Sequence, residues 1–473
     1  MSNDTGRSVA GLPLHTAVVF VLLFAAALAI YTALWRQTPA IDGDTPQYQE
    51  VARDLVNGRL ETLHDRSVGY PLLLAVTGAA DAPTWQLLVV SLCLHFASIW
   101  MLARVLLAAA VSRRWVVAFG VLLLLPPFAE PAAWVMTENL AQFMLVAGFT
   151  CLVLGFSPAR IGLLAAASLA VGYAALTRPV YQALACGLAA LVLALPAALR
   201  GLQIAYRDTI RAAVVLVAGS SIILGGMSYV NFVKFNYFGV VPSLGFHLST
   251  KTWALYERLP DEVAAVRDIL VRGRNAELAK RGSAHTGTQT IWEVRPELEA
   301  ATGLSKPQLS SLLLKWNLWL IRNAPLEYLL EVARSMATYW FPAATPLASM
   351  HVTALRWLWT TLHAAWVSGF FLQIIVLTGV AVFSASRSRA GQRAPLAVPW
   401  AGITVFQSIA WIIPAAIVVY TMLLSCFIDI GDPRQRRPTD VLVIFLCVLG
   451  AHVWRQSLHA RDDGRPVRGL SVY

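Results

Sequence analysis

Apolar runs of about 20 residues recur along this chain of 473 residues, with short polar segments between them. A helix of that length crosses the roughly 30 Å hydrocarbon core of a bilayer, and the runs lack the period-two alternation of membrane strands. Charged residues make up only 13% of the chain, whereas about 25% is usual in soluble domains. We therefore expect an all-α polytopic membrane protein of about ten transmembrane helices. The runs fall at 15–34, 85–110, 114–128, 138–156, 161–176, 180–198, 212–231, 352–384, 397–427 and 439–455.

The net charge of +11 comes from Lys and Arg residues that lie mostly in loops between the runs. Such loops mark the cytoplasmic side of a membrane protein, so no nucleic-acid partner is expected. Three segments then face outward: Arg36–Thr84, Pro126–Thr137 and Phe232–Met350. We expect a multi-pass protein of the inner (plasma) membrane. The cytoplasmic loops and tail contain Arg113, Arg114, Arg160, Arg200, Arg207, Arg211, Arg387, Arg389, Arg393, Arg455, Arg461, Arg465 and Arg468.

One basic cluster breaks this charge bias. Arg434, Arg436 and Arg437 lie outside if 397–427 is one tilted span, kinked at Pro414. They lie inside if that run forms two short spans. Charge alone favours the inside placement.

The spans and loops divide the chain into three modules. Residues 1–231 form an N-terminal transmembrane module, whose first outer loop covers 36–84. Residues 232–350 form an extracytoplasmic region, and 351–473 form the last transmembrane helices with a short cytoplasmic tail. Cap residues and helical spacing predict juxtamembrane helices near 45–57 and 259–281, lying along the membrane surface.

Several familiar sites are missing from the sequence. The five cysteines lie in or beside apolar runs, which predicts neither a disulfide framework nor a metal site. Neither a Walker motif nor a strand-linked Gly-x-Gly-x-x-Gly is present, so no nucleotide site is expected. The first run could pass for a signal peptide, but it continues beyond the possible cleavage site and predicts an uncleaved anchor.

Two carboxylates, Asp42 and Asp44, directly follow the first span. A carboxylate at this position can act as a general base toward an acceptor hydroxyl or amine. Alternatively, Asp44 serves only to cap the helix predicted after it. The residues themselves leave these two interpretations about equal.

A longer pattern around Asp44 resembles a known family. Asp44, then Tyr48, then Arg66-Ser67-Val68-Gly69-Tyr70-Pro71 is similar to the first outer loop of the GT-C superfamily. This superfamily includes the protein O-mannosyltransferases and the lipid A aminoarabinose transferases, which take a sugar from a polyprenyl phosphate. The family's loop aspartate is its catalytic base. The resemblance places that role on Asp44, with Asp42 as the weaker candidate.

Further motifs follow in the family's order. Glu138, in Trp134–Leu140, matches an acidic residue that family members often carry, and intramembrane carboxylates are functional candidates. Arg178 stands in a Leu-x-Arg-Pro turn and suits a phosphate. As alternatives, Glu138 starts a helix and Arg178 anchors at the interface. Asp432–Pro438 resembles the turn before a late span of the family; that turn is outside, which favours a single span at 397–427.

The resemblance implies an integral membrane glycosyltransferase that transfers a sugar from a polyprenyl-phosphate donor to an extracytoplasmic glycan, lipid or protein. Inverting attack would use an aspartate base, and no cofactor is required, although Asp42, Asp44 and Glu138 could hold a divalent metal. The rivals are a lipid-linked-sugar flippase, disfavoured because no internal symmetry is visible, and a membrane glycan polymerase or ligase. The expected catalytic residues are Asp44, Glu138 and Asp42. The expected phosphate ligands are Arg66, Arg178, Lys251, Arg434 and Arg437, and the positioning residues are Tyr48, His64, Tyr70 and His247.

Overall fold

The computed structural model describes residues 14–37, 41, 43–156, 160–199, 204–281, 287–341, 353–389 and 404–462. Within these ranges the protein is built from helices and turns, without a strand. The all-α polytopic fold is therefore confirmed. Asp42, one of the candidate bases, lies outside the described residues.

Seven of the described helical segments are long and apolar enough to cross a membrane. The other expected spans also contain apolar helices, but these are shorter or bent. The helix α8 (Ile161–Thr177) is short, and α1 (Leu14–Gln37) has an apolar part at Ala17–Ala33. The helix axis turns by 69° between Arg113–Leu123 and Pro127–Ala133, where consecutive prolines interrupt the backbone hydrogen bonds. The seven segments are Trp85–Ala108 (α4), Thr137–Leu154 (α7), Pro179–Ala198 (with α9, Leu184–Ala198), Tyr206–Phe235 (α10), Trp357–Val376 (in α16, Thr353–Arg389), Val405–Ile428 (α17) and Pro433–Gln456 (in α18, Pro433–Asp462).

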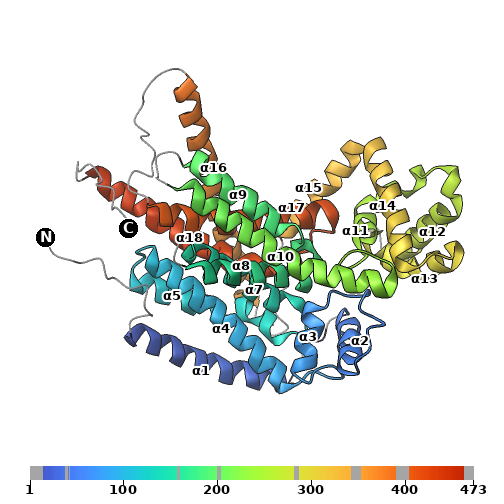
Figure 1. The fold of residues 1–473 in the computed structure, drawn as a ribbon, viewed down its shortest axis with the longest axis horizontal. Helices are drawn as coiled ribbons and strands as arrows, with labels where there is room; N and C mark the ends of the chain where they lie inside the picture. Colours follow the sequence, from blue (N-terminus) through green and yellow to red (C-terminus); the bar gives the residue numbers. More distant parts are fainter. Residues whose placement is uncertain are drawn as a thin grey trace.

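The helices outside the spans gather at one end of the bundle. In Figure 1, α1 begins and α18 ends at the left, whereas α2 (Thr45–Val56) and α3 (Gly69–Val76) lie at the right. The helices α11 (Leu244–Thr252), α12 (Ala264–Arg281), α13 (Thr290–Thr302) and α14 (Lys306–Asn323) lie at that same right end. The first loop and the long segment after α10 therefore meet at one end, as their assignment to one membrane side requires.

The helices α11 to α14 share a small apolar core. Phe246, Leu270, Ile291, Leu298 and Leu309 are buried together in it. The apolar face predicted for 259–281 belongs to α12, and it packs into this core instead of facing a membrane surface. The reason is that the long segment supplies a second amphipathic helix, α13, to cover it.

The basic cluster lies at the junction between the last two spans. The helix α17 runs without a break through Pro414, and α18 begins at Pro433, so the described part of 397–427 is a single helix. The predicted turn at Asp432–Pro438 is wrong in one respect, since Pro433 onward is already helical. The backbone N–H of Arg434 donates to Asp432 Oδ1 at 2.6 Å, which caps the helix start.

Candidate active site

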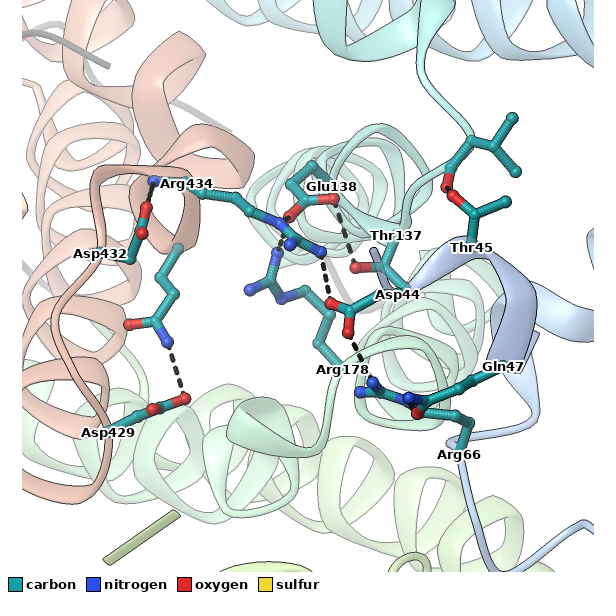
Figure 2. Close-up of polar contacts among 12 residues, drawn as sticks. Asp44, Thr45, Gln47, Arg66, Thr137, Glu138, Arg178, Asp429, Asp432 and Arg434 are labelled. Atoms are coloured by element: carbon teal, nitrogen blue, oxygen red, sulfur yellow. Dashed lines mark hydrogen bonds and ion pairs between the residues drawn. The ribbon is translucent and has the colours of Figure 1, made fainter. Parts of the chain in front are cut away.

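Asp44 lies at the start of α2, but its carboxylate does not cap that helix. Arg66 Nη2 donates to Asp44 Oδ1 at 2.6 Å, and Arg434 Nη2 donates to Asp44 Oδ2 at 3.0 Å (Figure 2). The two arginines come from the first loop and from the start of α18. The carboxylate is thus committed to long-range ion pairs and not to local helix capping.

Glu138, in the first turn of α7, is the buried centre of the same cluster. Its side chain is 1% exposed. Arg434 Nε donates to Glu138 Oε1 at 2.7 Å, and Arg178 Nη1 lies 2.9 Å from the same oxygen. Arg434 therefore bridges both carboxylates, as Figure 2 shows.

We call Asp44, Glu138, Arg66, Arg178 and Arg434 the arginine–carboxylate cluster. It contains one more arginine than carboxylates, so it carries an excess positive charge. The side chains of Asp44, Arg66 and Arg434 are each between a quarter and a third exposed, whereas Glu138 is sealed. A ligand can therefore approach from the Asp44 side, where charge-assisted hydrogen bonds from planar guanidinium groups suit a phosphate.

The two arginines set the protonation state of Asp44. Burial raises the pKa of the carboxyl, but Arg66 and Arg434 outweigh this effect and hold the pKa below its usual value. Asp44 is therefore ionised at neutral pH. While both arginines bind it, it is also a weaker base than a free aspartate.

Close packing of the first loop holds Arg66 in place. Its guanidinium lies 5.2 Å from the centre of the Tyr48 ring, and its Nε donates to Gln47 Oε1 at 2.7 Å. A side chain on Gly69 would meet the backbone of Leu176 at 2.7 Å, so only glycine lets the loop approach the end of α8 this closely. Arg178 follows two residues after that contact.

Tyr48 and Tyr70, both expected as positioning residues, pack under the first loop in the protein core. Their rings meet edge to face at 5.5 Å between centroids. Both side chains are buried in a core with Ala52 and Leu74. The structure thus gives them a packing position beside Arg66, with Tyr48 in direct contact.

The other expected phosphate ligands lie outside the arginine–carboxylate cluster. Arg437 Nη2 lies 3.8 Å from Glu130 Oε2, and its guanidinium lies over the Trp134 ring. Lys251 is buried and donates to the Ser335 hydroxyl. Burial lowers the pKa of Lys251 to about 8.

His247, an expected positioning residue, pairs with Asp429 in a second polar group. Sequence reasoning did not identify Asp429. His247 Nδ1 lies 3.0 Å from Asp429 Oδ2, and Gln435 Nε2 donates to the same oxygen at 2.7 Å. Because Gln435 follows Arg434, this pair adjoins the cluster through the first turn of α18. The only sequence signal for Asp429 was a carboxylate directly after an apolar run.

Arg436 belongs to the basic cluster but was not among the expected site residues, and it is fully buried. Its Nε donates to Asp440 Oδ1 at 2.7 Å, and its Nη1 donates to the carbonyl oxygens of Tyr339 and Trp340. It ties α18 to the end of α15 (Pro325–Trp340). The spacing of four residues between Arg436 and Asp440 was the available signal.

Among the described residues, no group of three or more His, Cys, Asp or Glu side chains is arranged to hold a metal ion. Asp44 and Glu138 are each bound by arginines instead. That the activity needs no cofactor stays a prediction, as does the role of Asp42.

Comparisons with known proteins identify no family. No family model matches the chain, and no curated protein matches it. Two crystal structures of ArnT from Cupriavidus metallidurans are similar in fold, one in the apo state and one bound to undecaprenyl phosphate. Each is 14% identical to this protein in sequence, and each match covers 79% of the ArnT chain. The matches cover 94% of this chain for the apo structure and 93% for the bound structure, with TM-scores of 0.38 and 0.39, respectively. Likenesses this weak assign no function.

Proposed function

We propose that this protein is a membrane glycosyltransferase that takes a sugar from a polyprenyl-phosphate donor and transfers it to an extracytoplasmic acceptor. The observation that carries this proposal is the arginine–carboxylate cluster, whose excess positive charge lies where the apolar helices α7, α8 and α18 begin or end. An apolar tail and an anionic headgroup together match that environment. The GT-C-like order of motifs around Asp44, Glu138 and Arg178 supports the same class.

In the proposed chemistry, the arginines bind the donor phosphate and the carboxylate of Asp44 acts as the base. Arg66 and Arg434 bind the donor phosphate with parallel N–H donors, and in doing so release the Asp44 carboxylate. The pKa of Asp44 then rises, because the cations that lowered it are now neutralised by phosphate. The buried carboxylate of Glu138 keeps Arg178 and Arg434 in position through its ion pairs.

In the transfer step, Asp44 accepts the proton of the acceptor hydroxyl or amine. The acceptor atom forms a bond to the anomeric carbon as the bond from that carbon to the phosphate oxygen breaks. Attack opposite the phosphate inverts the configuration. The arginines stabilise the charge that develops on the departing polyprenyl phosphate.

The test compares wild type, Asp44→Asn and Asp81→Asn in detergent or liposomes with a panel of radiolabelled polyprenyl-phosphate sugars. Asp81 is in the same outer loop but is 84% exposed, so it controls for the substitution itself. Release of polyprenyl phosphate should fall by about 10²–10⁴-fold in Asp44→Asn and stay unchanged in Asp81→Asn. Thermal unfolding of each variant checks the fold.

Other outcomes separate the rival functions. Full turnover by Asp44→Asn would remove Asp44 as the base. If wild type consumes no donor in the panel but moves the lipid-linked sugar across liposomes, the protein is a flippase. The polymerase or ligase alternative is distinguished by its product, since repeated transfer gives a ladder of chain lengths.

A further inference from the structure

A polar groove lies beside the arginine–carboxylate cluster and takes no part in it. Its volume is about 250 Å³, and one wall is formed by His64 and Asp65 of the first loop. The other wall is formed by Arg295 and Glu299 of α13 and by Lys306, the first residue of α14. Drug-sized ligands occupy about 300–1,000 Å³, so this groove suits a smaller group, of the size of a sugar ring.

An ion pair joins the two walls of the groove, one from the first loop and the other from α14. Lys306 Nζ donates to Asp65 Oδ1 at 2.7 Å and to the Asp65 carbonyl at 3.1 Å. Its side chain is 9% exposed. Burial raises the pKa of Asp65, but Lys306 outweighs this effect and lowers it, so Asp65 is ionised and the link is a true ion pair.

Other polar groups in the groove are left with hydrogen-bonding capacity. Arg295 Nε lies 3.7 Å from Glu299 Oε1, beyond hydrogen-bond distance, and both side chains are about one third exposed. His64 Nδ1 is buried and has no hydrogen-bond partner among the described residues. His64 Nδ1 is too deeply buried to meet a ligand, so the accessible hydrogen-bonding capacity of the groove lies on Arg295 and Glu299.

The charges of the groove indicate the class of ligand. Arg295 and Lys306 balance Asp65 and Glu299, so the groove has no formal excess charge, in contrast to the arginine–carboxylate cluster. Its lining therefore contains both cationic donors and carboxylate acceptors. A hydroxyl group both donates and accepts a hydrogen bond, so several hydroxyls on one ring match this lining better than a phosphate does.

The groove also lies next to the proposed reacting centre. Asp65 directly precedes Arg66, whose Nη2 is 2.6 Å from Asp44, and adjacent Cα atoms are only about 3.8 Å apart. We propose that this groove binds a carbohydrate ring of the acceptor and so presents one acceptor group to Asp44. This inference rests on the proposed function and narrows its acceptor to a carbohydrate-bearing molecule.

The test measures saturation transfer by NMR from the protein to methyl glycosides of glucose, galactose and glucosamine. The protein is held in a detergent without a sugar headgroup. Wild type should give a signal on the glycoside ring protons, which Glu299→Gln and Arg295→Gln should reduce at least threefold. The matched control is Glu297→Gln, on the same helix, whose partner is the exposed Arg272; it should leave the signal unchanged.

Three results would overturn the inference: no signal in wild type, equal signals in all variants, or displacement of the glycoside by inorganic phosphate. Donor consumption, measured in parallel, separates this inference from the proposed function. Donor turnover without glycoside binding refutes the groove alone. Glycoside binding lost in the groove variants, without any donor turnover, supports the groove and refutes the transferase.

Discussion

At the scale of single residues, Arg434 joins parts of the chain that are far apart in sequence. It bonds to Asp44 and Glu138, which are 390 and 296 residues away. A buried ion pair is costly to break, because removing one partner strands the other charge and costs about 3–5 kcal/mol. The arginine–carboxylate cluster thus locks the first loop, α7 and α18 together at one point.

Lys251 gives a prediction at this scale, because it is buried without an ion pair in any described contact. Burial lowers its pKa from 10.5 to about 8 in the folded protein. Between these two values the unfolded chain binds more protons, so the free energy of unfolding should rise with pH, by a total on the order of 3 kcal/mol. Below about pH 8 the full penalty remains.

Replacing Lys251 with Met should therefore raise Tm at pH 7.5 and abolish its increase between pH 8 and 10.5. Thermal unfolding in detergent, followed across this range, measures both effects. Lys280→Met changes an exposed lysine and should preserve the wild-type profile. A lower Tm for Lys251→Met at pH 7.5 would show that the ammonium group stabilises the fold through Ser335.

At the scale of elements, the turn between α17 and α18 positions Arg434 for its ion pairs with Asp44 and Glu138. Gly431, within this turn, has a φ of 67°, and an added Cβ would lie 2.6 Å from the Ser335 carbonyl oxygen. A non-glycine residue in this conformation costs about 1–2 kcal/mol before any clash is counted. Only glycine therefore fits the turn without moving α15 or the start of α18.

Gly431→Ala should lower Tm and reduce donor turnover at least tenfold, because Arg434 follows three residues later. Gly78→Ala is the control: its φ is 66°, but nothing lies within 4 Å of the added Cβ. It should lose only about 1 kcal/mol and keep turnover. Equal turnover in the two variants would show that the turn does not position Arg434.

Sequence patterns predicted the elements better than their contacts. The sequence Asp44-Thr45-Pro46 and the later Gly58 placed α2 within a residue or two of Thr45–Val56. Pro438 suggested a turn, yet α18 begins before it and continues through it. Whether Arg434 or Arg437 would meet Asp44 depended on the direction of α18, which no local pattern encodes.

At the scale of the whole molecule, the first loop, with α2 and α3, lies at the same end of the bundle as α11 to α14 (Figure 1). That loop supplies Asp44 and Arg66 to the arginine–carboxylate cluster, and His64 and Asp65 to the polar groove. The C-terminal end of α18 lies at the opposite end of the bundle. The charge bias predicts that the first end lies outside the cell membrane, and the proposed function requires it there, because the proposed acceptor is extracytoplasmic.

Cysteine labelling tests this orientation in a variant that lacks the five native cysteines. Asp81→Cys, in the exposed first loop, should react with a membrane-impermeant maleimide in right-side-out vesicles. Arg455→Cys, exposed near the end of α18, should react only after permeabilisation. The reverse pattern would place Asp44 on the cytoplasmic face and exclude an extracytoplasmic acceptor.

The ion pairs of Asp44 have a consequence for the end of each reaction cycle. Once the sugar has been transferred, polyprenyl phosphate is still bound to the arginines. It then competes for them with the carboxylate of Asp44, which is tethered beside them. A tethered group acts at an effective concentration of about millimolar or more, and it is never diluted away. In the proposed enzyme, Asp44 would therefore act as an internal displacer of the spent lipid carrier.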